Sequence, residues 1–290
     1  VGTSAGQGAS GQSNSGNTAV GTNAMASVTT GSNNVAIGYN ALDELTNSGD
    51  NVAIGYYALN ACDAGEGGNV AIGYAAGGDI DSTTADNNVI IGTSAGIGGA
   101  AAMAECVAIG YLAMNSTAAN AQTGTVAIGS NSLTALTSGS GNIAIGFEAM
   151  KVQTDGLRNI AIGYRAMDLM DSGEDDNIAI GYDAMGAANN ANTVQNVAVG
   201  NYALSSITTT KVDSTTAIGH EAGLNVVDGD NQVIIGQAAG ATLTTGASNT
   251  LIGKGADTSA SDSINQIVLG KSATGVADNS VTLGNADVTA

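Results

Sequence analysis

One short motif, Asn-Val-Ala-Ile-Gly-Tyr, repeats along the whole chain and constrains its fold more than any other feature. It stands at residues 34–39, 51–56 and 69–74, and with Ile in place of Val at 159–164 and 177–182. Looser copies keep the glycine, so anchor glycines follow one another every 17–19 residues, with a last step of 14 residues to Gly284. Self-similarity at a short, nearly fixed period predicts a stacked repeat protein, or solenoid.

The motif itself predicts a β-strand. Val35 and Ile37 alternate with Asn34 and Ala36, which is the period of two that places alternate side chains on opposite faces. Equivalent strands of successive coils would then form parallel ladders about 4.8 Å apart. We expect the Val/Ile face to form a thin core and the Ala face to lie outside. The expected core ladder is Val35, Ile37, Val52, Ile54, Val70, Ile72, Ile160, Ile162, Ile178 and Ile180.

The rest of each coil follows from the anchor glycine, which suits a turn with positive φ or a close backbone approach. Three residues later comes Ala, as at Ala41, followed by Leu or Met in one class of coil and by Gly in the other. We interpret this segment as a second short strand or a tight turn that packs against the Val/Ile face. The polar connectors, such as residues 47–50 and 171–176, carry the acidic residues and are expected to be solvated.

These patterns predict an all-β chain, a parallel β-solenoid or β-roll of about 17 short coils. Residues 1–290 would form a single repeat domain, with 254–290 as divergent, shorter terminal coils. Because both ends fall inside a repeat, at 1–2 and 281–284, we expect the chain to be a fragment of a longer fibre.

Composition narrows the possible partners. The net charge of -19 argues against binding to nucleic acid or to an anionic membrane surface. The longest apolar runs are only a few residues, so no membrane insertion is expected. Much of the hydrophobic content is Ala, and so thin an interior would struggle to offset the ordering entropy of each coil. We therefore expect oligomerisation through the Ala faces, with a homotrimer as the first choice.

The Val-Ala-Ile-Gly-x-x-Ala pattern resembles the head repeats of trimeric autotransporter adhesins. That resemblance implies a left-handed parallel β-roll in an intertwined or side-by-side homotrimer. The longer coils, with Asn-Val-Ala-Ile-Gly-Tyr-x-Ala-Leu, look more like repeat regions of phage tail fibres, and residues 284–290 resemble the segment before a self-cleaving chaperone domain in such fibres. The resemblance implies an extracellular virion structural protein for host attachment, which extends and displays a receptor-binding region.

Three alternatives remain open. A bacterial trimeric autotransporter adhesin head on the outer cell surface has the same fold. An ice- or surface-binding solenoid needs a regular Thr array, whereas Thr208–Thr210 and Thr244–Thr245 cluster in irregular loops. An enzyme is not expected, because no carboxylate pair or nucleophile stands in a recognisable catalytic motif.

An aromatic residue directly follows many anchor glycines. Equivalent positions stack in a solenoid, so these residues should form an interrupted stripe along the fibre. Two interpretations are open: a surface for a glycan or cell-surface receptor, or a ladder that stacks on itself or against another chain. The expected stripe is Tyr39, Tyr56, Tyr74, Tyr111, Phe147, Tyr164 and Tyr182.

Several polar residues invite functional hypotheses. His220 occupies the aromatic position but has no Cys/His cluster or paired nucleophile, so it is expected only to fill that position. The Asn that begins many coils predicts a hydrogen-bonded Asn ladder. No cofactor is expected, although structural calcium is a hypothesis at Asp228, Asp230 and Asn231. Cys62 and Cys106 lie about three coils apart, too far for a disulfide, and are expected to be free thiols.

Overall fold

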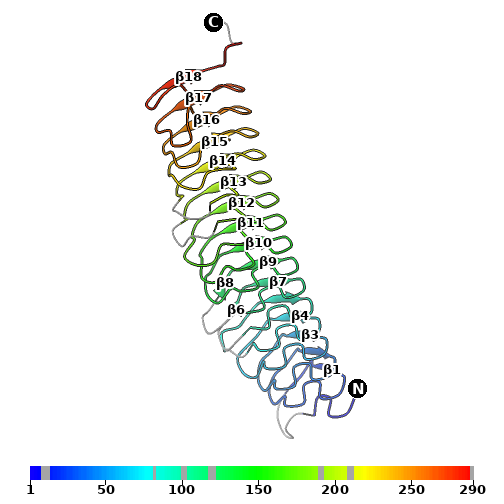
Figure 1. Ribbon diagram of the computed structural model, residues 1–290. Coiled ribbons are helices and arrows are strands. Elements are labelled where there is room, and N and C mark those ends of the chain that lie inside the picture. The colour runs from blue at the N-terminus through cyan, green and yellow to red at the C-terminus, as the bar shows by residue number, and fades with distance from the viewer. Residues whose placement is uncertain are drawn as a thin grey trace. The chain divides into compact units, whose positions relative to one another are not determined.

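The structure is a computed structural model. It describes residues 1–7, 14–80, 83–98, 103–116, 122–188, 193–207 and 212–287. These residues form a parallel β-solenoid that contains no helix, as predicted. The chain divides into two compact units, Val1–Ile145 and Gly146–Ala290. Figure 1 shows the stacked strands of both units.

Each coil contributes one short strand to a parallel ladder. The first unit holds β1 (Thr18–Val20), β2 (Val35–Ile37), β3 (Val52–Ile54), β4 (Val70–Ile72), β5 (Val89–Ile91), β7 (Val107–Ile109), β9 (Val126–Ile128) and β10 (Ile143–Ile145). The second unit holds β11 (Ile160–Ile162), β12 (Ile178–Ile180), β13 (Val197–Val199), β14 (Thr216–Ile218), β15 (Val233–Ile235), β16 (Thr250–Ile252), β17 (Ile267–Leu269) and β18 (Val281–Leu283). The solenoid has about 15 turns, slightly fewer than the 17 expected, because Gly2 follows no strand and the 16 strands of the ladder are joined by 15 steps.

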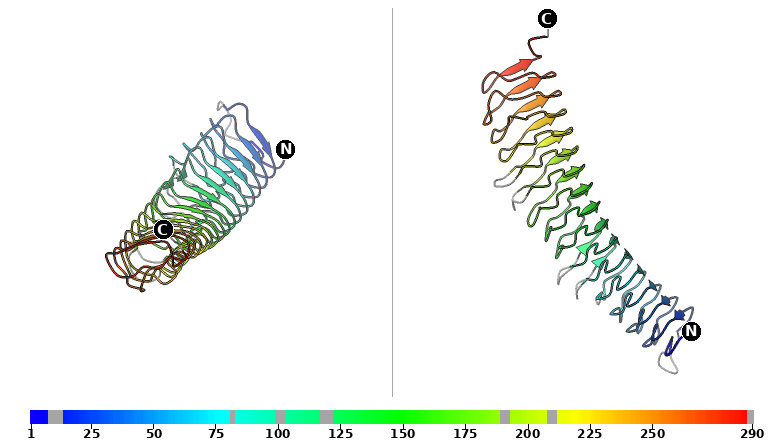
Figure 2. Two further views of the ribbon diagram at one scale, coloured as in Figure 1. Left: turned by 90° about the horizontal axis from the view of Figure 1, so that it is seen from above. Right: turned by 45° about the vertical axis from the view of Figure 1, so that its right-hand side comes forward.

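The ladder keeps its register although the coils differ in length. Ala36 pairs with Ala53, which pairs with Ala71, so successive steps span 17 and 18 residues without shifting the pairing. The variation lies in the connectors, as expected for a repeat protein. The shortening predicted over 254–290 is confined to the last step, from β17 to β18, which spans 14 residues. Figure 2 shows the coils of the second unit nearly end-on, each wound round the same interior.

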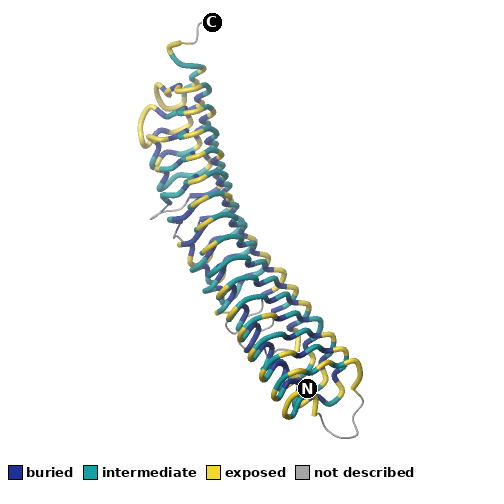
Figure 3. Tube along the Cα trace, turned by 90° about the vertical axis from the view of Figure 1, so that its right-hand side faces the viewer, coloured by how far each residue is buried: buried dark blue, intermediate teal, exposed yellow. Residues whose placement is uncertain are grey.

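The predicted assignment of the two strand faces is wrong. The central alanines, such as Ala36 and Ala53, are 0% exposed and line the interior, whereas Val35 is half-buried and Ile37 is 39% exposed. Every member of the expected core ladder is half-buried or exposed and points outward: Val35, Ile37, Val52, Ile54, Val70, Ile72, Ile160, Ile162, Ile178 and Ile180. Buried and exposed residues consequently alternate along the coils in Figure 3.

The alanines face inward, and Val and Ile outward, because the interior of the coil is narrow. The Ala and the Leu or Met that follow each anchor glycine, for example Ala41 and Leu42, both point inward and are fully buried. They leave room for no more than a methyl group at most strand centres. The Ala-Leu segment is a tight turn and not a second strand, because Asn40 (φ 53°) and Leu42 (φ 51°) adopt left-handed conformations. In the first unit, a second sheet consists only of β6 (Met103–Ala104) and β8 (Gln122–Thr123).

The two classes of coil share the interior volume differently. Ile90 and Ile234 replace the usual strand-centre Ala and are fully buried. Their coils have glycine where most others have Leu or Met: a Cβ on Gly96 would lie 3.2 Å from Ile90 Cγ2, and one on Gly240 would lie 3.3 Å from Ile234 Cγ2. The preceding coils follow the same rule, since a Cβ on Gly77 would lie 3.1 Å from Ile90 Cδ1. In these coils a large strand residue thus accompanies a missing side chain in the turn, whereas the coils of the fully buried Leu251 and Val268 carry Asp257 and Thr274 at that turn position.

Two backbone predictions are confirmed. The Asn ladder exists: Asn51 is fully buried, its N–H donates to Asn34 Oδ1 at 2.9 Å, and its own Oδ1 accepts from the Asn69 N–H at 2.9 Å. The anchor glycines combine positive φ with close approach. Gly38 has φ 144°, and a Cβ there would lie 2.2 Å from the Gly55 carbonyl oxygen. Because the coils are this close, no larger residue fits at the anchor without moving the backbone.

Candidate functional site

Six of the seven aromatic residues in the predicted stripe stack on the outer surface, in two groups of three. In the first unit, Tyr56 stacks with Tyr39 at a centroid distance of 5.1 Å and with Tyr74 at 5.3 Å. In the second unit, Tyr164 stacks with Phe147 at 5.1 Å and with Tyr182 at 5.2 Å. Ring planes within each stack lie 2–17° from parallel. We call these two groups of three the aromatic stacks.

Each aromatic stack ends where the residue after an anchor glycine is not aromatic. Tyr111 belongs to the stripe by position and is exposed, but the preceding coil carries Thr93 in that place, so Tyr111 lies outside the first stack. His220 also occupies the aromatic position, as predicted. Its ring lies edge-on to Tyr202 at 6.4 Å, and its Nδ1 is 3.6 Å from Glu221 Oε2.

Two further tyrosines, which the sequence analysis missed, flank the stacks. Tyr57 and Tyr202 follow the aromatic position by one residue and have left-handed φ of 58° and 60°. Tyr57 lies 4.6 Å from the Tyr56 ring, and Tyr202 lies edge-on to Tyr182 at 5.2 Å. Desolvation by burial raises the pKa of both hydroxyl groups. For Tyr57, the sequence signal was the consecutive pair Tyr56-Tyr57. A search restricted to the residue after the anchor glycine does not detect it.

The outward-facing first and third residues of the strands form a second surface feature, which we call the outer strip. It is built mainly of Val and Ile in every coil and contains no charged residue in β1 to β18. Val20 (42% exposed) and Ile72 (37%) belong to it in the first unit, and Ile252 (39%) in the second. The outer strip exposes apolar side chains at every step of each ladder.

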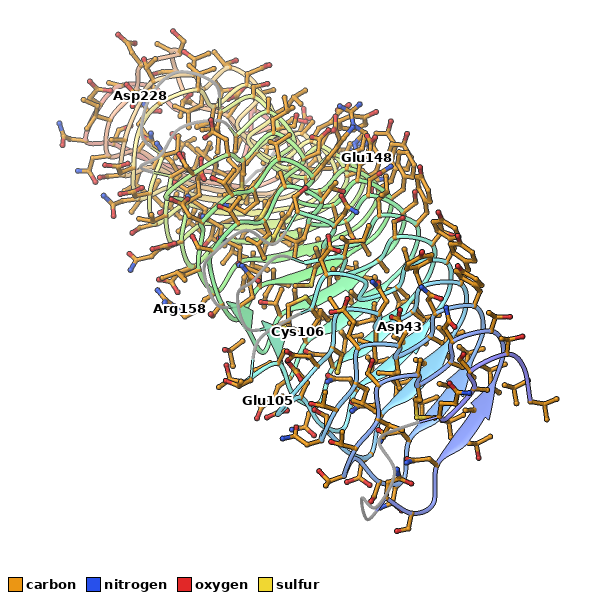
Figure 4. The ribbon with its side chains drawn as sticks, turned by 90° about the horizontal axis from the view of Figure 1, so that it is seen from below. Asp43, Glu105, Cys106, Glu148, Arg158 and Asp228 are labelled. Atoms are coloured by element: carbon orange, nitrogen blue, oxygen red, sulfur yellow. The ribbon has the colours of Figure 1, made fainter. Side chains whose placement is uncertain are left out.

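Charged side chains cluster in the second unit. Arg165 contacts Asp168 at 2.5 Å and Glu148 at 3.9 Å, while Lys151 contacts Glu148 at 2.7 Å. Desolvation raises the pKa of Asp168 despite its bond to Arg165. Figure 4 shows Glu148 and Arg158 on opposite margins of the coils. Arg158 is paired with Asp176 at 2.6 Å, which lowers the pKa of that carboxyl group.

The expectation that the acidic connectors are solvated is wrong for Glu66, Asp168, Glu174 and Asp213, all of which are buried. Glu66 and Glu174 are fully buried, and the Oε1 atom of each has no hydrogen-bond partner. Glu66 Oε2 accepts from the Ser48 hydroxyl at 3.2 Å, and Glu174 Oε2 accepts from Gln153 Nε2 at 3.5 Å. Burial raises the pKa of both, that of Glu174 to about 7. Both stand three residues before an Asn of the ladder, where the connector turns inward.

The calcium candidates take part in hydrogen bonds with the backbone. Asp228 Oδ1 accepts from the Gly229 N–H at 2.8 Å, Asp230 Oδ1 accepts from the Asp213 N–H at 2.9 Å, and the Asn231 N–H donates to the Asp213 carbonyl at 3.0 Å. Within the described ranges, no group of three or more His, Cys, Asp or Glu is arranged to hold a metal ion. The acidic side chains of this loop bond to the backbone of their own or the neighbouring coil.

The two cysteines are free and buried, as predicted. The Cys62 thiol donates to Glu66 Oε2 at 3.7 Å, and burial raises the pKa of the Cys106 thiol. Neither thiol lies on the outer surface. Two segments named in the sequence analysis, Thr208–Thr210 and the last three residues of 284–290, lie outside the described residues.

Comparison with known proteins gives no family for this chain. No protein-family model matches the sequence, and no curated protein matches it significantly. In the part of the chain that the structure describes, no helix is long and apolar enough to cross a membrane.

Proposed function

We propose that this chain is a structural segment of an extracellular virion fibre, in which three copies lie side by side and carry a host-receptor-binding region. The observation that carries the proposal is the outer strip. Its apolar residues recur in every coil, and a contiguous exposed apolar surface of this kind marks an interaction site. The virion setting is supported by the resemblance of the repeat to phage tail fibres.

A second copy of the chain is the occupant that fits the outer strip best. Its side chains recur once per coil, at the strand spacing of about 4.8 Å. A partner matches that spacing over many coils only if it is built from coils of the same height, as another copy is. The strands carry no charged residue, so two copies with a net charge of -19 each can meet there without burying charge.

The fibre role follows from the way a solenoid grows. Each coil contacts only its neighbours, so added coils lengthen the molecule without enlarging its core. A closed ring of three copies leaves the loops and the aromatic stacks available on the outside. An ice-binding role is less well supported, because Val and Ile fill most of the outer strip and only Thr18, Thr216 and Thr250 place threonine there.

The oligomer is tested by sedimentation equilibrium at micromolar concentration. The chain mass is 28.0 kDa, and we expect three times that mass. Replacing Ile37 and Ile54 together by Asp places charges in the outer strip and should dissociate the assembly. The matched control is Ser116→Asp, which adds a charge at an exposed position outside the strands and should leave the mass unchanged. A monomeric mass for the unaltered chain overturns the trimer.

The virion role needs a separate observation. Cryo-electron microscopy of particles that contain this chain should show threefold fibres attached to the capsid or tail. Fibres attached to a cell envelope would instead support the adhesin alternative.

A further inference from the structure

A hollow of about 340 Å³ lies beside the aromatic stack of the first unit. Its lining includes the rings of Tyr56, Tyr57 and Tyr74 and two polar side chains, Asn60 and Asp79. The rings and the polar groups come from two successive coils. A concave site with aromatic walls and a few polar groups has the composition of a small-molecule site.

The hollow exists because one coil lacks side chains that its neighbours have. The residues two and five positions after the anchor glycine face the same surface. In the first of three successive coils these are Tyr57 and Asn60, in the next Ala75 and Gly78, and in the third Ser94 and Ile97. Ala75 and Gly78 therefore form a floor, with Tyr57 and Asn60 on one side and Ile97 on the other.

Local geometry supports this arrangement. Asn60 Oδ1 lies 3.3 Å from the point that a Cβ on Gly78 would occupy, so the Asn60 side chain reaches over the floor. Tyr74 is the last ring of its stack, since Thr93 occupies the next aromatic position, and it is 57% exposed.

The equivalent positions in the second unit are filled by charge. Glu148 and Lys151 hold them in one coil, and Arg165 and Asp168 hold them in the next, joined by the ion pairs described above. Equivalent turn positions thus carry an ion-pair network in the second unit and line an aromatic hollow in the first.

The charged residues near the hollow limit the charge of the ligand that it can bind. All six basic residues of the chain lie beyond residue 150, whereas Asp79 lines the hollow, so an anionic ligand is disfavoured. Tyrosine rings offer apolar surface with a polar hydroxyl edge. Asn60 can donate and accept hydrogen bonds, and the Asp79 carboxylate accepts them. A ligand with one apolar face and a rim of hydroxyl groups satisfies all of these groups together.

We propose that this hollow binds one pyranose unit of a neutral glycan. The apolar face of the sugar ring packs against the tyrosines, and its hydroxyl groups bond to Asn60 and Asp79. A shallow site for a ligand of this size should have a dissociation constant of about 1–10 mM. The inference does not rest on the proposed fibre role, because the hollow is built from turn residues and not from the outer strip.

The test uses saturation-transfer difference NMR with the methyl glycosides of glucose, galactose, mannose and N-acetylglucosamine, and with tetramethylammonium as a cationic probe. Ala75→Leu fills the floor, and the fold already accepts leucine at this position because Leu112 (φ 56°) occupies it in another coil. Tyr57→Asn removes a wall, with Asn40 (φ 53°) as its precedent. Ala238→Leu makes the same change at the equivalent position of the second unit and is the matched control.

We expect saturation transfer to at least one methyl glycoside, with affinity reduced at least tenfold in Ala75→Leu and Tyr57→Asn and unchanged in Ala238→Leu. Circular dichroism of each variant establishes that it is folded. The proposal is overturned if no glycoside binds the unaltered chain, or if Ala75→Leu binds as well as Ala238→Leu. It is also overturned if tetramethylammonium binds with this dependence and the sugars do not, because the hollow would then be a cation–π site. Since the chain mass is measured independently, failure here leaves the trimer test unaffected.

Discussion

The anchor glycines set how closely the coils approach, residue by residue. A Cβ on Gly38 would lie 2.2 Å from the Gly55 carbonyl oxygen at a φ of 144°, which L side chains rarely adopt. We expect Gly38→Ala to lower the free energy of unfolding by about 3 kcal/mol, measured by thermal or denaturant unfolding. Gly124→Asn is the control, because Gly124 has φ 63° with no atom within 4 Å of an added Cβ. Equal losses in the two variants would contradict this account.

Glu174 should make stability depend on pH. Burial raises its pKa in the folded chain to about 7 from the ordinary value of 4.5, so the folded state favours the protonated form. Its contribution to stability is therefore complete below pH 4.5 and is lost as the pH rises through about 7. The loss is on the order of 3 kcal/mol. We expect the melting temperature of the unaltered chain to fall between pH 5 and pH 8 relative to that of Glu174→Gln.

The matched control for Glu174 is Glu105→Gln at an exposed position. That variant should follow the pH dependence of the unaltered chain. A Glu174→Gln curve parallel to that of the unaltered chain would show that the buried carboxyl group does not titrate in this range.

At the scale of the strand, the sequence determined which residues share a face but not which face lies inside. The period of two groups Val35 with Ile37 and separates them from Ala36, and that grouping is correct. The inward direction depends on how much space remains after Leu42 and Ala41 have turned into the coil. This is a property of the closed coil, so a strand examined alone favours the more hydrophobic face as the core. The same local view missed Glu66 and Glu174, whose burial depends on the path of the connector.

The shared use of interior volume by strand and turn can be measured as a coupling free energy between a strand residue and a turn residue. Ile90→Ala should leave a cavity and cost about 2–5 kcal/mol of unfolding free energy. Gly96→Leu should overpack the interior and cost about 1–3 kcal/mol, although Leu42 (φ 51°) shows that the turn itself accepts leucine. We expect the double variant to be clearly more stable than the sum of the two changes predicts.

A pair of positions in separate coils provides the control for this double-mutant comparison. Gly96→Leu combined with a cavity substitution at Leu133, two coils away, should show additive losses. Additive losses in the Ile90–Gly96 pair as well would mean that the two positions do not share their space.

Over the whole molecule, the coil is the unit that can be removed. Deleting residues 34–50 takes out one 17-residue step and brings together coils that both have Ala in the strand and Leu or Met in the turn. We expect this variant to fold with an unchanged circular dichroism spectrum per residue and a melting temperature within a few degrees of the original. Deleting residues 88–105 removes Ile90 while leaving Gly77 behind, and should lower the melting temperature markedly. Equal effects of the two deletions on the melting temperature would show that Ile90 is not needed to fill the space beside Gly77.

The interior therefore makes the coils of Ile90 and Ile234 not interchangeable with those that have Ala in the strand and Leu or Met in the turn. A gene built from near-identical repeats lengthens and shortens readily when misaligned copies recombine. In this chain, only crossovers that keep a bulky strand residue beside its glycine-bearing turns give a filled interior. Alleles of different length should accordingly gain or lose the Ala-centred coils one at a time. The segments around Ile90 and Ile234 should pass between alleles only together with the glycines of their own and the preceding coil.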